Sequence, residues 1–147
     1  MRKQHWSKRD PIKNYFPLPN EIYQLGLSPR AVAIYGYLLS IENRETYEAY
    51  ASYNTIGEAT QMSRNTVRKY VEELEERELI TTERTTITTL DGRRQNGCLR
   101  YHILPIQMSL NQFYERQFAA MDLAQEQWKV QQAIKRKEAR RNAASGE

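Results

Sequence analysis

The chain has 147 residues, which suits one domain with an extension, and its hydrophobic content of 39% is enough for a modest core. Its single cysteine, Cys98, excludes an intramolecular disulfide framework, and His5 and His102 form no metal-ligand spacing with it. There is no run of 18 apolar residues and no apolar signal segment after the basic N-terminus. We therefore expect a cytoplasmic protein with no membrane insertion and no cofactor.

The formal net charge of +4 is distributed unevenly. Residues 1–14 carry five basic and one acidic side chain, for +4, whereas residues 15–107 carry ten and twelve, for −2. Residues 108–147 carry seven and five, for +2. The first segment is interpreted either as a basic arm that contacts DNA or as a solvated tail. Because the central segment is not basic overall, affinity for a polyanion would have to come from local basic clusters and from the two basic end segments.

Residues 16–51 predict two helical pieces and a loop. The run from 16 to 27 contains a short helical turn that Gly26 would end. A longer helix is predicted to begin at Pro29 with Ser28 as its N-cap, and residues 42–51, polar and without a period, are expected to form a loop. The apolar face of the longer helix is broad, which indicates burial: Ala31, Ile34, Tyr35, Leu38, Leu39 and Ile41.

Residues 52–80 contain two short helical patterns separated by a tight turn. In the first pattern Ile56 and Ala59 are expected to point inward. Its N-cap is either Ser52 or Thr55, which has the T-x-x-E spacing of a capping box. The three-residue turn that follows, with Met62 as an apolar plug, predicts two helices that cross at a large angle.

The second pattern has a buried stripe and a polar face. Its apolar residues follow the spacing i, i+3, i+4 and i+7: Val67, Tyr70, Val71 and Leu74. The opposite face changes from basic to acidic along its length, so its N-terminal half can face a polyanion. Ser63 is a good N-cap, which would place free backbone N–H groups and the positive end of the helix dipole beside the basic residues.

After residue 80 the pattern changes to the alternation typical of strands. A Thr-rich segment, a turn at Asp91-Gly92 and a second alternating segment predict a β-hairpin. A hairpin directly after such a helix would be a wing. Its tip is expected to contact phosphate or the minor groove, the alternative being ordinary exposed surface. Four residues are assigned to this tip: Arg93, Arg94, Gln95 and Asn96.

Residues 107–145 contain no Gly or Pro and predict a long helix. If Ser109 or Asn111 caps it and it runs to about Arg141, it is on the order of 50 Å long, more than so small a domain can cover. Two adjacent apolar stripes suggest that one packs on the domain and the other on a second copy; alternatively, one helix packs on its own domain and then frays. The residues expected to dimerise are Leu110, Phe113, Tyr114, Met121 and Trp128.

The run S-Y-x-T-I-x-E-A-T-x-M-S-R-N-T-V-R-K-Y-V-E-E-L closely resembles winged helix-turn-helix domains of Gram-positive bacterial, phage and plasmid proteins, including replication initiators and small regulators. The resemblance covers about residues 16–104. The expected fold is mainly α with a small β-hairpin wing: a winged helix-turn-helix plus a long C-terminal helix. The expected division is a basic flexible arm (1–14), the winged domain (15–106), the long amphipathic helix (107–142) and a disordered tail (143–147).

Three functions remain open. The first is a sequence-specific regulator that binds double-stranded DNA as a homodimer. The second is a plasmid or phage replication-initiation or maintenance protein that binds origin DNA, and the third is a protein-interaction module on a winged-helix scaffold. No enzyme constellation, membrane partner or small-molecule site is evident in the sequence. The DNA-contacting residues expected from the second helix are Ser63, Arg64, Asn65, Thr66, Arg68 and Lys69.

Overall fold

The structure is a computed structural model that describes residues 15–146. These residues divide into two compact units, one up to Leu110 and one from Asn111 onward. The basic arm expected for residues 1–14 lies outside the described residues. Each unit is described separately below.

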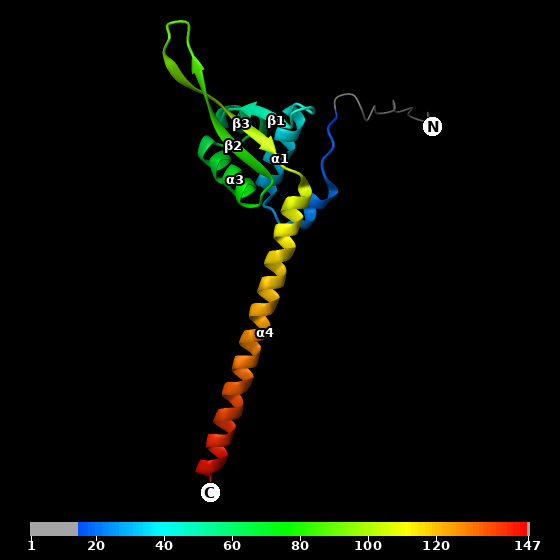
Figure 1. The fold of residues 1–147 in the computed structure, drawn as a ribbon, viewed down its shortest axis with the longest axis vertical. Coiled ribbons are helices and arrows are strands. Elements are labelled where there is room, and N and C mark those ends of the chain that lie inside the picture. Colours follow the sequence, from blue (N-terminus) through cyan, green and yellow to red (C-terminus); the bar gives the residue numbers. More distant parts are fainter. Residues whose placement is uncertain (1–14, 147) are drawn as a thin grey trace, which may run out of the picture. The chain divides into compact units, whose positions relative to one another are not determined.

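The first unit combines three helices with a small sheet, which confirms the expected mainly α fold with a hairpin wing (Figure 1). A 3₁₀ turn, η1 (Asn20–Gln24), and the predicted long helix α1 (Pro29–Ile41) come first. The remaining elements, in chain order, are β1 (Glu48–Ala51), α2 (Tyr53–Thr60), α3 (Arg64–Glu76), β2 (Ile80–Thr88), β3 (Arg94–Ile103) and α4 (Ile106–Ser145).

Helix α1 is central to the core. It begins at Pro29 as predicted, because the fixed φ of proline suits the first helical position and the missing N–H is unneeded there. Ser28 occupies the N-cap position without a side-chain cap bond; its hydroxyl donates instead to the carboxylate of Glu73 on α3. Four of the six residues predicted for the buried face of α1 are buried; Leu39 is half-buried, and Ile41, at the last helical position, is 38% exposed.

The loop expected for residues 42–51 is wrong at its end, where Glu48–Ala51 form β1. This strand pairs antiparallel with β3, with Ala49 opposite Tyr101. Its two inward residues, Ala49 and Ala51, are small, whereas the large Tyr50 between them is exposed. The usual alternation of large apolar and polar residues is therefore reversed, and this reversal removed the signal of a strand.

The sheet has the order β1-β3-β2, so the second strand of the wing is the central strand. The strands β2 and β3 form the predicted hairpin, with Ile80 opposite Ile103 near the core. Their pairing is irregular between Arg84 and Thr86, and beyond this point the hairpin extends past β1 (Figure 1). The near half of the hairpin therefore belongs to the core, and the far half stands free as a wing.

Helix α4 is longer at both ends than predicted. It begins at Ile106, so Ser109 lies inside the helix as a buried residue rather than capping it. The disorder expected for residues 143–147 is wrong as far as Ser145, which is still helical, because the alanines before it favour continuation of the helix. Within residues 15–146, no helix has the length and apolar content needed to cross a membrane.

Candidate nucleic-acid interface

Helix α2 and the turn after it set the position of the next helix. The Ser52 hydroxyl accepts a hydrogen bond from the Thr55 N–H at 3.1 Å, which identifies Ser52 as the N-cap. The helix ends at Gln61 in the left-handed region, and the Met62 N–H donates to the Gly57 carbonyl oxygen at 2.9 Å. A Cβ atom at Gly57 would lie 2.4 Å from the Met62 carbonyl oxygen, so only glycine fits this crossing.

The prediction for the inward side of α2 is wrong at one residue. Ala59 was expected to point inward and is exposed, whereas Gly57 is buried beside Ile56. Glycine carries no apolar side chain, so a pattern of hydrophobic residues cannot recognise it as the contact position. The close approach of α2 to the turn therefore depends on a residue that periodicity does not reveal.

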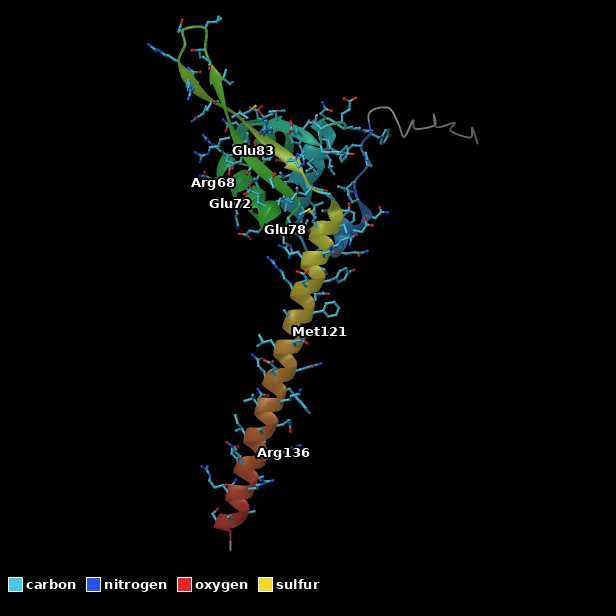
Figure 2. All side chains as sticks on the ribbon, in the orientation of Figure 1. Arg68, Glu72, Glu78, Glu83, Met121 and Arg136 are labelled. Carbon is cyan, nitrogen blue, oxygen red and sulfur yellow. The ribbon has the colours of Figure 1, made fainter. Side chains whose placement is uncertain are left out.

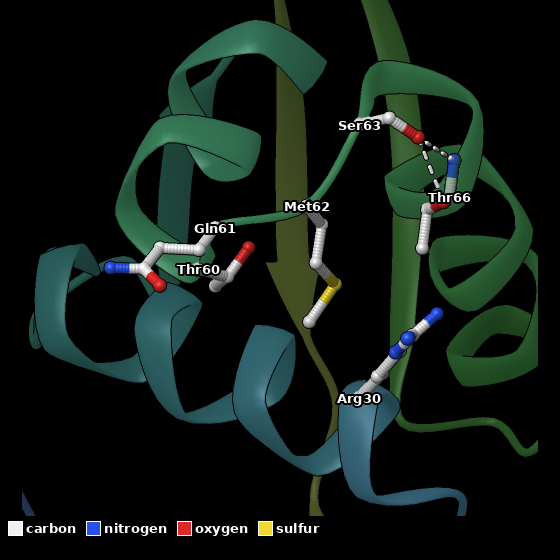
Figure 3. A pocket seen from close by; sticks show the side chains of 6 residues that line it. All are labelled: Arg30, Thr60, Gln61, Met62, Ser63 and Thr66. Carbon is white, nitrogen blue, oxygen red and sulfur yellow. Dashed lines mark hydrogen bonds between the residues drawn. The ribbon is translucent and has the colours of Figure 1, made fainter.

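Helix α3 is capped as predicted. The Ser63 hydroxyl accepts a hydrogen bond from the Thr66 N–H at 3.3 Å, and the two hydroxyl oxygens lie 2.8 Å apart (Figure 3). Val67, Val71 and Leu74 are buried, which confirms the stripe, although Tyr70 is only half-buried. The core thus fixes the rotation of α3 about its axis and determines which of its side chains reach solvent.

The solvent face of α3 carries its positive charge near the N-terminus. Arg64, Asn65, Arg68 and Lys69 are all exposed. The Arg68 Nε atom lies 3.3 Å from an oxygen of Glu72, one helical turn further along (Figure 2). Both side chains are more than half exposed, so this pair is worth at most about 1 kcal/mol and breaks readily when a stronger partner approaches.

The acidic residues in the C-terminal half of α3 are partly engaged inside the domain. The Glu73 carboxylate accepts one hydrogen bond from the Ser28 hydroxyl and another, at 3.2 Å, from the Ser28 backbone N–H. Glu75 accepts the hydroxyl of Thr82 on β2, and burial, followed by the charge of Glu72, raises the pKa of its carboxyl. These two carboxylates therefore tie α3 to α1 and to the sheet.

A basic residue outside the predicted set lies beside the N-terminal end of α3. The guanidinium of Arg30 is 6.0 Å from the centre of the Tyr70 ring, and the Lys69 ammonium is 5.5 Å from it. Arg30 comes from the first turn of α1, where no sequence pattern singles it out. Arg30 and five residues of the helix-turn-helix line a shallow hollow (Figure 3). These five residues are Thr60, Gln61, Met62, Ser63 and Thr66.

The wing turn contains the predicted Asp91-Gly92 pair. It comprises residues 89–93, closed by a hydrogen bond from the Thr89 N–H to the Arg93 carbonyl oxygen at 2.9 Å, and Gly92 takes the positive φ that the turn requires. Only Arg93 of the four predicted tip residues lies in this turn. The other three belong to β3: Arg94 pairs with Thr88, Gln95 with Ile87 and Asn96 with Thr86.

All four wing residues are nevertheless exposed. The tip also exposes two apolar side chains that the sequence analysis did not assign, since Leu90 is fully exposed and Ile87 is 55% exposed. The far half of the wing therefore presents basic, amide and aliphatic groups together. Among residues 15–146, no group of three or more potential metal ligands occurs.

One known family matches part of the chain. Residues 25–80 match the family described as "Helix-turn-helix domain". No curated protein sequence matches the chain.

Two solved structures are similar to the chain at low identity. The first is a possible transcriptional regulator from Methanosarcina mazei Go1, at 13% identity and a TM-score of 0.48, with 79% of this chain and 98% of that one covered. The second is S. aureus MepR in a DNA complex, at 16% identity and a TM-score of 0.36, with 78% and 86% covered. The helices α2 and α3 with the turn between them form a helix-turn-helix, and the hairpin of β2 and β3 completes a winged helix-turn-helix fold.

Proposed function

We propose that this chain is a sequence-specific double-stranded DNA-binding protein, a small cytoplasmic regulator that acts as a homodimer and has no catalytic activity. The observation that carries the proposal is the solvent face of α3. Exposed Arg and Asn side chains follow a capped helix N-terminus, and such side chains form paired hydrogen bonds with guanine and adenine edges. Helix α3 is then the recognition helix, and the wing contacts the DNA phosphate backbone or the minor groove next to the site that α3 reads.

The proposal is tested by selecting preferred sites from random duplex DNA and measuring affinity for the selected and scrambled duplexes at several salt concentrations. A regulator should prefer the selected site by roughly 10³-fold or more. Its affinity for either duplex should fall steeply with salt, because phosphate neutralisation releases counterions. Selection of no sequence, with no measurable binding to random duplex at low salt, would contradict the proposal.

The homodimer rests on the exposed apolar side chains of the second unit. Helix α4 exposes six large ones between residues 118 and 134, each at least half exposed, and such a concentration is uncommon on soluble monomers. Pairing with a second copy along one side of α4 would cover Met121 and Trp128 among them, and a two-fold dimer would favour an inverted-repeat target. The exposed residues are Phe118, Met121, Leu123, Trp128, Val130 and Ile134.

Two other functions would share this fold. A plasmid or phage replication or maintenance protein would use the same DNA contacts on origin DNA, so mapping bound sites in the surrounding genome distinguishes it from a regulator. A protein-interaction module would instead use the acidic C-terminal half of α3. The engagement of Glu73 and Glu75 within the domain favours the DNA-binding functions, because it leaves fewer free carboxylates for a partner.

The joint replacement of Arg93 and Arg94 with alanine is expected to weaken specific and non-specific binding together. Both side chains stand on the exposed half of the wing, where they can reach phosphates without reading bases. The salt dependence of binding should lose about 0.9 in its logarithmic slope for each phosphate contact removed. Replacing Arg44, an exposed arginine in the segment before β1, is the control; equal slopes for both variants would limit the wing to a structural role.

Replacing Glu72 with glutamine is expected to strengthen DNA binding up to about fivefold, since an exposed ion pair holds at most about 1 kcal/mol. The change frees Arg68 from its intrahelical partner and removes a negative charge from the face that meets phosphate. Fluorescence anisotropy on the preferred duplex measures the change. Glu45→Gln, which removes an exposed carboxylate before β1, supplies the control, and a weaker complex for Glu72→Gln alone would show that Glu72 itself contacts DNA.

A further inference from the structure

The apolar residues of α4 are not equivalent in position. One set follows a 4-3 spacing that a helix brings to a single side, and we call it the tryptophan stripe: Leu110, Tyr114, Met121, Ala124 and Trp128, with Gln117 and Gln131 at the intervening positions. Tyr114, Met121 and Trp128 are 46%, 58% and 62% exposed. The stripe therefore has the spacing of a coiled-coil seam; Leu110 at its start is buried in the first unit, whereas the part from Tyr114 to Trp128 is exposed among residues 15–146.

We propose that the tryptophan stripe pairs with the same stripe of a second copy in the antiparallel direction, with Trp128 of each helix over Ala124 of the other. This inference rests on the homodimer part of the proposed function and specifies its geometry. Three features of the stripe favour this direction over the parallel one: its side-chain volumes, the position of one lysine and the distribution of charge along α4.

The first feature is the order of large and small side chains. In a parallel pair, identical residues meet, so Trp128 would face Trp128 and Ala124 would face Ala124 one layer away. The indole layer would be overfilled, and the alanine layer would leave a gap. In the antiparallel pair each indole lies over an alanine methyl group, which gives two equal layers on either side of the two-fold axis. Packing at native density favours this alternation of large and small residues.

The second feature is Lys135, which continues the 4-3 spacing beyond Gln131. A parallel pair would place two Lys135 ammonium groups together in the seam, where partial burial makes the repulsion costly. In the antiparallel register that pairs Trp128 with Ala124, two residues that face each other lie at equal distances on either side of residue 126. Lys135 then meets Gln117, whose amide oxygen can accept a hydrogen bond from the ammonium group.

The third feature is the charge along α4. Residues 106–126 carry three acidic and one basic side chain, for −2, whereas residues 127–145 carry six basic and one acidic, for +5. Paired helices lie about 8–10 Å apart, comparable to the screening length at physiological salt. A parallel pair would set the two +5 halves side by side along their whole length. The antiparallel pair sets each +5 half against a −2 half, so the opposite charges of the facing halves attract each other.

The direction of the pair can be tested with spin labels on the full-length chain. Cys98, the only cysteine, is replaced by serine, or by alanine if the serine variant folds poorly, and one new cysteine is introduced at exposed Ala143 or exposed Glu126. The proposed register puts the two-fold axis at residue 126. At a rise of 1.5 Å per residue, labels at residue 143 should then lie roughly 50 Å apart, and labels at residue 126 should lie within roughly 25 Å.

Each result of the double electron–electron resonance measurement decides between the arrangements. A long distance at residue 143 with a short one at residue 126 supports the antiparallel pair. Short distances at both positions would overturn it in favour of a parallel pair, while the homodimer would stand, because both arrangements have two-fold symmetry. A monomeric mass with no dipolar coupling at either position would overturn the homodimer itself. DNA affinity of the same labelled proteins, measured in parallel, reports separately on the DNA-binding part of the proposed function.

Discussion

Replacing Asn65 or Arg68 with alanine is expected to cost roughly 1–3 kcal/mol at the preferred DNA site, which corresponds to a five-fold to 150-fold loss of affinity for each change. Both side chains lie on the exposed face of α3, close to its capped N-terminus. The loss should be specific to the preferred site, because base-edge hydrogen bonds discriminate between sequences whereas phosphate contacts do not. Fluorescence anisotropy with the selected duplex and with single-base variants measures both quantities.

The matched control for Arg68 is its replacement by lysine. Lysine keeps the positive charge and loses the planar fork that binds guanine through two hydrogen bonds. Arg68→Lys should therefore retain most of the salt dependence and lose preference at one base position, whereas Arg68→Ala should lose both. If the double variant Asn65→Ala, Arg68→Ala still selects the same site with unchanged preference, α3 does not read the sequence and another element does.

The parts of this fold that the sequence predicts are those with a regular apolar period. The buried stripe of α3 and the start of α1 at Pro29 fall where the pattern places them. The strand β1 was missed because its inward residues are alanines, and the contact at Gly57 was missed because glycine has no side chain to contribute to a pattern. Burial of a small residue depends on how closely a neighbouring element approaches, which is a tertiary property that local sequence does not encode.

The candidate site shows the same division. Exposed residues of α3 follow from the stripe on its opposite side, so Arg64, Asn65 and Lys69 could be predicted together. Arg30 could not, because it reaches the site from α1 through the packing of two helices and through the ring of Tyr70. The role of the glutamates at the end of α3 could not be predicted either. The structure shows that Glu73 and Glu75 form hydrogen bonds within the domain, to Ser28 and Thr82.

The strongest loss of binding to a complete operator is expected from a change far from α3 in sequence. Replacing both Met121 and Trp128 with glutamate places two charges in the tryptophan stripe and should separate the homodimer, because burying a carboxylate without a charged partner in an interface costs several kcal/mol. A monomer must bind each half-site independently, without the high effective concentration that the partner supplies. Affinity for the inverted repeat should therefore fall by at least about 100-fold, while weak binding to one half-site remains.

A matched control adds the same charge elsewhere on α4. Ala119 and Ala133 are exposed and lie on the side of the helix opposite Trp128, so Ala119→Glu with Ala133→Glu should leave the dimer and its affinity nearly unchanged. Light scattering at tens of micromolar gives the mass of all three proteins, and circular dichroism confirms that the helix content of each is retained. A wild-type chain that is already monomeric at this concentration would refute the dimer, and α4 would then need a different partner for its exposed tryptophan.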